Sequence, residues 1–221
     1  MFETTDDAIR ALTEADGDAR KRAAEQLKEL REAPATDALL AALASPQVNI
    51  RLNVTEALGH HGHDPRVPEA LVNLLRDPTP SIRQQAARAL GDIADPATEA
   101  DLLAALNDPE EKVSRAIIKT LGVLGGEASL LPLLNGLLGH PSTAVRVVSA
   151  KSLGQLADPR ATKGLTQALR HDSKWVVRYA TIAALAAIGG DSARQAITAA
   201  RTDDSNELVR RAARDALAGG T

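Results

Sequence analysis

The chain has 221 residues, with 26 Lys and Arg against 29 Asp and Glu and an apolar fraction of 44%, an ordinary balance for a soluble protein. It has no Cys, which excludes disulfides, thiolate metal sites and Cys nucleophiles, and its three aromatic residues leave Ala, Leu, Ile and Val to build a core. No apolar run is long enough to span a membrane and the N-terminus lacks a signal pattern, so we expect a cytoplasmic protein without a membrane segment.

A single frame of residues recurs along the whole chain. It consists of an aliphatic-Arg pair, Ala three or four residues later, Leu-Gly, Asp-Pro and a Leu-rich tail, and it is clearest in residues 82–109 and 145–172. The Arg position recurs at intervals of 31 or 32 residues, with Ser114 in the one gap. Seven occurrences at a nearly fixed period predict a solenoid of stacked repeats. The Arg residues of the frame are Arg20, Arg51, Arg83, Arg146, Arg178 and Arg210.

Each repeat predicts two helices, which we call the A helix and the B helix. Residues 6–16 match a lone B helix, six complete A–B pairs follow, and residues 207–220 match a lone A helix. Apolar residues recur at helical spacing, for example Ile82, Ala86 and Leu90 in an A helix expected over about 79–91. The expected fold is therefore one all-α domain over residues 1–221, a right-handed α-α superhelix of about fourteen helices without strands.

Glycines and Asp-Pro pairs predict where these helices begin and end. In four repeats a Gly follows the frame Leu of the A helix, and we expect it to end the helix in the left-handed conformation. The Asp-Pro pair that follows is expected to cap the B helix. Residues 108–111 and 204–207 are typical of capping boxes that begin A helices. The glycines are Gly59, Gly91, Gly122 and Gly154, and the pairs are Asp64-Pro65, Asp95-Pro96 and Asp158-Pro159.

The repeat resembles the HEAT-repeat superfamily, and within it the short HEAT-like repeats of the phycobilisome lyase type. The resemblance rests on the phrase Leu-Gly-x-(Ile/Leu)-x-Asp-Pro and on an Asp six residues before the frame Arg. It implies a ladder of hydrogen bonds between these Asp and Arg residues across neighbouring repeats, which suits the planar Arg fork. The pairs are Asp77 and Arg83, Asp172 and Arg178, and Asp204 and Arg210. We therefore expect the frame arginines from Arg51 onward to be structural.

The resemblance extends to families with chemical activities, which the residues here do not support. A related di-iron hydroxylase binds iron through repeated His-Glu pairs, but no His of this chain is followed by Glu. Related bilin lyases share the repeat, yet the repeat residues alone carry no chromophore chemistry. No Ser-His-Asp, phosphate-loop or metalloprotease pattern is present. We expect no catalytic residue, no metal and no cofactor.

Three of the five histidines, His60, His61 and His63, fall within four residues and are candidate metal ligands. His61 stands where the other repeats place an aliphatic residue such as Ile93, and His63 occupies a one-residue insertion before Asp64. Because a metal needs further ligands in a fixed geometry, we favour a longer polar turn over a zinc or iron site. We expect His60 to be exposed. The other two histidines, His140 and His171, belong to B–A turns at the opposite edge of the repeats.

Two aromatic residues stand at variable positions of the repeat. Trp175 and Tyr179 lie one turn apart on the A helix of the sixth pair, where other repeats have unrelated residues. Variable positions of a repeat are usually exposed, so the two aromatics form a candidate anchor for a binding partner. The alternative is that they cover a local gap or make a contact between copies of the chain.

Charge is distributed unevenly along the sequence. Residues 1–108 hold 11 basic and 19 acidic side chains, whereas residues 109–221 hold 15 and 10. On successive B helices Lys163 aligns with Arg194, and Arg170 aligns with Arg201. B helices line the concave face of HEAT-type solenoids, so these four residues are candidates to bind an acidic partner there. The alternative for Arg170 and Arg201 is that they complement helix C-termini.

The sequence thus supports a non-catalytic scaffold that binds a protein partner through the basic residues or the aromatic pair. A lyase-type protein that handles a chromophore or cofactor is the alternative, and a designed or consensus-like array is a further one. Overall acidity, the lack of aromatics on the B helices and the low excess of Lys and Arg argue against nucleic-acid binding.

Overall fold

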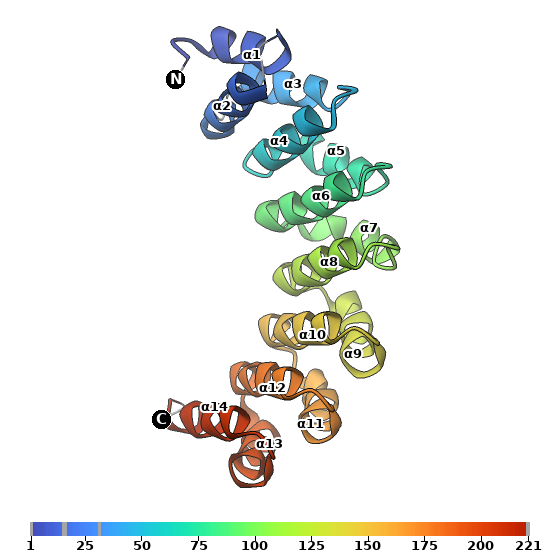
Figure 1. Ribbon diagram of the computed structural model, residues 1–221, viewed down its shortest axis with the longest axis vertical. Coiled ribbons are helices and arrows are strands. Elements are labelled where there is room, and N and C mark those ends of the chain that lie inside the picture. The colour runs from blue at the N-terminus through green and yellow to red at the C-terminus, as the bar shows by residue number, and fades with distance from the viewer. Residues whose placement is uncertain (1, 15–16, 31, 220–221) are drawn as a thin grey trace. The chain divides into compact units, whose positions relative to one another are not determined.

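The computed structural model describes residues 2–14, 17–30 and 32–219, so residues 15–16 and 220 of the predicted terminal helices lie outside the described residues. Over these residues the chain forms fourteen α-helices, three short 3-10 helices and no strand, which confirms the all-α prediction. The chain divides into two compact units, Met1–Thr120 and Leu121–Thr221. Within each unit the helices alternate between two layers, one of A helices and one of B helices (Figure 1).

The A helices pack against one another in sequence order within each unit, as α2, α4 and α6 do in the first and α10, α12 and α14 do in the second. The boundary between the units falls inside α8. The A helices are α2 (Gly17–Glu29), α4 (Val48–Leu58), α6 (Pro80–Ile93), α8 (Glu111–Leu124), α10 (Thr143–Leu156), α12 (Trp175–Ile188) and α14 (Glu207–Ala218).

The B helices form the second layer, and in the second unit α11 packs between α9 and α13. Three B helices begin with a short 3-10 turn: η1 (Pro96–Thr98), η2 (Glu127–Ser129) and η3 (Pro159–Ala161). The B helices are α1 (Thr5–Glu14), α3 (Ala33–Ala42), α5 (Arg66–Leu74), α7 (Glu99–Ala104), α9 (Leu130–Gly139), α11 (Thr162–His171) and α13 (Gly190–Asp203). None of the described helices combines the length and apolar character needed to cross a bilayer.

Between the layers lies a core of aliphatic side chains, as the composition predicts. The Leu before each frame Gly is fully buried, and small residues such as Ala86 and Ala89 fill the space around it. Burying one such Leu contributes about 1.5–3 kcal/mol to folding. Because the same position is buried in these four repeats, each helix pair depends on its neighbour to cover its apolar face. The frame leucines are Leu58, Leu90, Leu121 and Leu153.

The frame arginines join neighbouring repeats through a fork of hydrogen bonds. Arg83 donates from Nη1 to the backbone carbonyl of Asp77 at 2.8 Å, and from Nε and Nη2 to the two carboxylate oxygens of Asp108 at 2.6 and 2.9 Å. The Asp six residues before an Arg therefore supplies its carbonyl, whereas its carboxylate pairs with the Arg of the preceding repeat. The predicted ladder is present with this refinement. Its side-chain pairs are Arg51–Asp77 and Arg83–Asp108 in the first unit, and Arg146–Asp172 and Arg178–Asp204 in the second.

These pairs are shielded from solvent: the Arg83 and Asp108 side chains are only 12% and 8% exposed. The Arg83 guanidinium holds the pKa of the Asp108 carboxyl below its usual range. The ladder changes at the remaining frame positions. Ser114 donates to the Asp108 carbonyl at 3.3 Å, and the Nδ1 of His140 accepts from the Ser142 N–H at 3.1 Å. Arg210 donates to the Asp204 carbonyl and pairs with Glu207 of its own helix.

The prediction that the frame glycines are left-handed is wrong for all four, and only Gly59 ends its helix as predicted. Gly91, Gly122 and Gly154 lie inside helices, and Gly59 follows α4 with right-handed φ and ψ. They allow close approach of the next A helix instead. A Cβ on Gly154 would lie 2.8 Å from the Cα of Ala184, and one on Gly122 would lie 2.6 Å from the Cβ of Ser152.

The left-handed position lies three residues after the frame Gly. It is occupied by Ala94 with φ 56°, by Gly125 with φ 69° and by Ala157 with φ 51°. In α6 and α10 this residue closes the helix by donating to the carbonyl four residues earlier. The sequence does not predict this left-handed position, because Ala, which ordinarily avoids positive φ, occupies it twice.

The Asp-Pro prediction is confirmed for Asp95 and Asp158 but not for Asp64, because the cap residue of α5 is Pro65. The capping boxes are not confirmed. Asp95 and Asp158 are the caps of η1 and η3, and each carboxylate accepts from the N–H two residues later. Asp108 and Asp204 instead form the turn before their helices while their carboxylates pair with ladder arginines. The cap of α14 is Asn206, whose side chain accepts from the Leu208 N–H.

We expect Arg83→Ala to lower the free energy of unfolding by about 1–3 kcal/mol, because the carboxylate of Asp108 would lose its partner in a shielded site. Chemical denaturation followed by circular dichroism measures the change. Arg88→Ala on the same helix is the control, since Arg88 is exposed. Equal effects of the two substitutions would show that the ladder contributes nothing specific.

We expect Gly154→Ala to destabilise the protein by about 1–3 kcal/mol, because the new methyl group would meet the backbone of Ala184. An ordinary helix interior would gain up to about 1 kcal/mol from the same change. Gly139→Ala is the matched control, since no atom lies within 4 Å of its added Cβ. Thermal unfolding of both variants gives the sign, and a more stable Gly154→Ala would contradict the close-approach role.

Candidate functional site

The histidine cluster is divided between the interior and the surface. His61 is fully buried, whereas His60 and His63 are exposed, as expected for His60. The Nε2 of His61 lies 3.0 Å from the carbonyl of Leu27, and its Nδ1 lies 2.8 Å from the hydroxyl of Thr36. A carbonyl only accepts, so Nε2 carries the proton and Nδ1 accepts from Thr36. Both nitrogens are therefore engaged by protein groups and not directed at a ligand.

The other histidines lie in different surroundings. His140 supports the turn before α10, and His171 is exposed at the end of α11. The described residues contain no group of three or more His, Asp and Glu side chains arranged to hold a metal ion. The aliphatic slot that the sequence assigned to His61 is thus a polar, internally bonded position that joins α2 and α3 to the A–B turn after α4.

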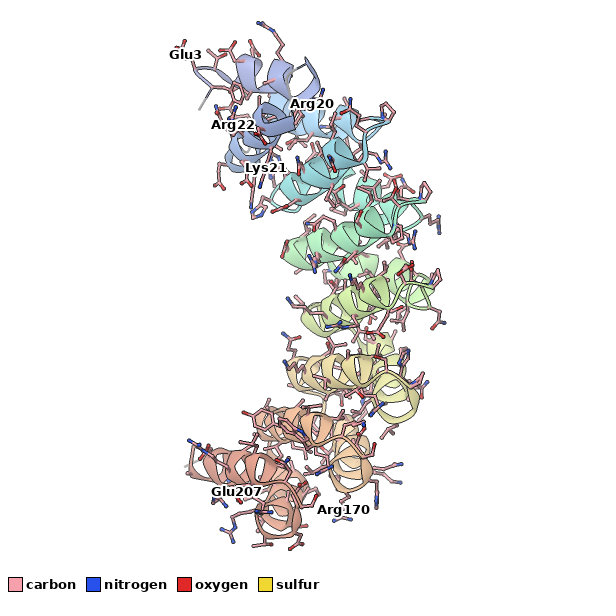
Figure 2. All side chains as sticks on the ribbon, viewed as in Figure 1. Glu3, Arg20, Lys21, Arg22, Arg170 and Glu207 are labelled. Atoms are coloured by element: carbon pink, nitrogen blue, oxygen red, sulfur yellow. The ribbon has the colours of Figure 1, made fainter. Side chains whose placement is uncertain are left out.

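The four basic residues singled out by the sequence lie on adjacent B helices of the second unit. Lys163 and Arg170 lie on α11, Arg194 and Arg201 lie on α13, and all four are exposed. Arg170 is labelled on this layer in Figure 2. Lys163 and Arg170 line an open groove between the two helices, which Gln195 of α13 also lines. Arg194 and Arg201 line a second hollow, on α13, together with Asp191.

The aromatic pair lies on the other layer, at the start of α12. Trp175 and Tyr179 are 39% and 48% exposed, as expected from their variable repeat positions. Their ring centroids are 6.4 Å apart and the rings are nearly perpendicular at 85°, the favourable edge-to-face arrangement. The structure thus places the aromatic pair and the basic residues on different helices in different layers.

A second set of arginines forms ion pairs with carboxylates at the A–B turns, which the sequence did not lead us to expect. Arg66 pairs with Asp64 beside it and with Asp37 of the preceding repeat, at 2.6 and 2.7 Å. Hydrogen bonds from Arg66 lower the pKa of Asp64 to about 2. Arg160 pairs in the same way with Asp158 and with Glu127. The signal was available, because in both places Arg directly follows the capping Asp-Pro pair.

Two exposed leucines on α9 were also missed. Leu131 and Leu138 are 68% and 42% exposed on a B helix of the second unit. The segment LLPLLNGLL suggests a core helix by its composition, which concealed that two of its leucines face solvent.

We expect His61→Ala to lower the free energy of unfolding by about 2–4 kcal/mol, because it removes the buried hydrogen bonds to Leu27 and Thr36 and opens a cavity. His63→Ala, at the exposed neighbouring position, should change it by less than about 0.5 kcal/mol. Denaturant titration compares the two. Metal analysis after dialysis is the companion measurement: one equivalent of zinc or iron that disappears in His61→Ala would overturn the structural role.

Comparison with known proteins places these features in a wider context. The chain is 24% identical to, and has a TM-score of 0.63 against, a chain in the structure of the CpcE–CpcF complex of phycocyanin lyase from Nostoc sp. PCC7120; the match covers 100% of this chain and 96% of that one. An archaeal HEAT-like repeat protein from Thermococcus onnurineus NA1 matches at 13% identity and a TM-score of 0.59, over 99% of this chain and 97% of that one. At these identities the likeness is one of fold, and it confirms the HEAT-like solenoid.

A protein of known sequence is similar to this chain over a shorter stretch. The uncharacterized phycocyanin operon protein Z of Pseudanabaena tenuis (strain PCC 7409) is 34% identical over 83 residues, which are 38% of this chain and 41% of the relative. The match therefore spans less than half of either protein. The model of HEAT repeats matches residues 5–80, 68–135 and 130–218, nearly the whole sequence. From its repeat frame, its paired helices and this match, the chain belongs to the HEAT repeat family.

Proposed function

We propose that this chain is a non-catalytic scaffold, one HEAT-like repeat domain over residues 1–221 that binds an acidic protein partner. The observation that carries the proposal is the placement of Lys163, Arg170, Arg194 and Arg201 at matched, exposed positions of α11 and α13. Repeat proteins keep their core positions similar and vary their exposed ones, so selective binding arises from the exposed positions. A row of cations on neighbouring helices attracts a partner that carries carboxylates.

The aromatic pair supplies a second candidate contact for the same partner. Trp175 and Tyr179 offer a large apolar surface at little cost in side-chain entropy, and tryptophan and tyrosine are enriched among the residues that dominate binding energy. Because they lie on α12 and the cations lie on α11 and α13, the two contacts are separable by mutation.

A lyase-type or chromophore-handling role is the second candidate. Its support is the likeness to the phycocyanin lyase structure over the full length of both chains, together with the short match to a phycocyanin operon protein. An absorption spectrum of the chain purified from its own host tests this candidate directly. A visible band that copurifies in a fixed ratio would favour it over the scaffold, and a colourless protein that still captures a partner would favour the scaffold.

The scaffold proposal is tested by cross-linked capture of the tagged chain in its host, followed by binding kinetics with the purified partner. We expect Lys163→Glu with Arg194→Glu to slow association by roughly tenfold and to flatten its salt dependence, because rim charges steer encounter. We expect Trp175→Ala to speed dissociation, with a loss of about 2 kcal/mol, if the aromatic pair is the anchor.

The matched control is Lys151→Glu, an exposed lysine on α10, which carries none of the proposed contact residues. It should leave both rate constants unchanged. Wild-type kinetics in both test variants would place the binding surface elsewhere and refute the proposed residues.

A further inference from the structure

The exposed leucines of α9 form an apolar strip along one face of the helix. Leu131 and Leu138 are seven residues apart, which is two helical turns, so their side chains project from the same face about 10 Å apart. Between them Leu134 is half-buried. An exposed leucine is ordinary, but two on one face of a B helix, with a third leucine between them, make an apolar strip that no described helix covers.

This strip occupies the same repeat positions as the basic residues. Leu131 and Leu138 precede Lys163 and Arg170 by 32 residues, and Arg194 and Arg201 follow these by 31. The three B helices α9, α11 and α13 pack side by side in the second unit. The strip also touches the next helix, because a Cβ on Gly164 would lie 2.5 Å from the Cδ2 of Leu134. Leucines on one helix therefore lie next to cations on its neighbour.

The charge beside the strip is concentrated on α11. Neither Lys163 nor Arg170 forms an ion pair with a carboxylate of the described residues. Arg160, which lines the same groove, is already held by Asp158 and Glu127. On α13 the carboxylate of Asp191 lines the same hollow as Arg194 and offsets part of its charge. A carboxylate brought by a partner would thus find its counter-ions at Lys163 and Arg170.

We propose that α9 and α11 together bind an amphipathic, acidic α-helix of a partner protein. The inference rests on the scaffold function and specifies the form of its ligand. The partner helix lies along α9 with apolar residues at spacings of three, four and seven on Leu131 and Leu138. The carboxylates of the partner helix lie beside its apolar face and contact Lys163 and Arg170. Helix-in-groove recognition uses this spacing of apolar anchors, and the adjoining cations select an acidic sequence.

Four labelled 18-residue peptides test the proposal against the full chain by fluorescence anisotropy. One is an amphipathic helix with leucines on one face and glutamates beside them, and the second replaces the glutamates by glutamine. The third has the composition of the first in scrambled order, and the fourth replaces the glutamates by lysine. We expect the first peptide to bind at least roughly tenfold more tightly than the other three, since each buried Leu and each desolvated charge pair contributes on this scale.

Two double variants and a control then assign the binding to the two helices. Leu131→Ser with Leu138→Ser, and separately Lys163→Glu with Arg170→Glu, should each weaken the first peptide by roughly tenfold or more. All four residues are exposed, so folding should survive, and circular dichroism checks it. Leu208→Ser is the matched control, because Leu208 is an exposed leucine on α14 of the other layer. It should bind the peptide as the wild type does.

The outcomes separate this inference from the scaffold proposal. Equal binding of the scrambled and amphipathic acidic peptides, with no effect of the leucine variant, would overturn the helix-binding inference and leave an acidic partner in place. Failure of both acidic peptides to bind would overturn the inference and remove the support for an acidic partner. Tighter binding of the lysine peptide, or of a single-stranded DNA oligonucleotide, would also refute it.

Discussion

A shielded guanidinium between two repeats is the contact on which this architecture depends. Each complete Arg fork holds the carbonyls of the turn before its own helix and the carboxylate of the turn before the next A helix, as Arg178 does with Asp172 and Asp204. The fork fixes the spacing of consecutive A helices at the turn edge, and the frame glycine fixes their close approach further along. At the opposite edge, Arg66 and Arg160 tie the starts of B helices to the preceding repeat, so the exposed faces of these helices can vary without loss of either contact.

The period, the helix pairs and the structural arginines could all be predicted from the sequence, because each follows from a pattern that repeats. Local details could not. Gly91 suggests a helix end by its type, but a contact with the next repeat, at Thr120, explains it. Ala94 holds a left-handed conformation that its type argues against. The sequence also left open which atoms each Arg contacts, because sequence proximity does not distinguish a backbone carbonyl from a side-chain carboxylate.

The candidate site residues likewise divide into those that the repeat pattern predicted and those that it did not. Comparison of equivalent positions found the cations of α11 and α13 and the aromatics of α12, because a charged or aromatic residue at a variable position is conspicuous. It missed Leu131 and Leu138, since leucine on a B helix resembles core. The spacing of 32 residues that aligns them with Lys163 and Arg170 can nevertheless be read from the sequence. For His61 the repeat frame showed that it replaces an aliphatic residue, but only the structure shows that it is buried and hydrogen-bonded to Leu27 and Thr36.

The ladder is also directional. Each complete side-chain pair joins an Arg to an Asp that lies 25 or 26 residues further along the chain, in the repeat that follows. A duplicated stretch of one full period would bring with it both the carboxylate for the Arg before it and the Arg for the carboxylate after it. A deletion of part of a repeat would instead leave an Arg and an Asp without their partners in a shielded turn. Insertion or removal of whole repeats therefore preserves the pairing of the ladder, whereas a change of any other length breaks it.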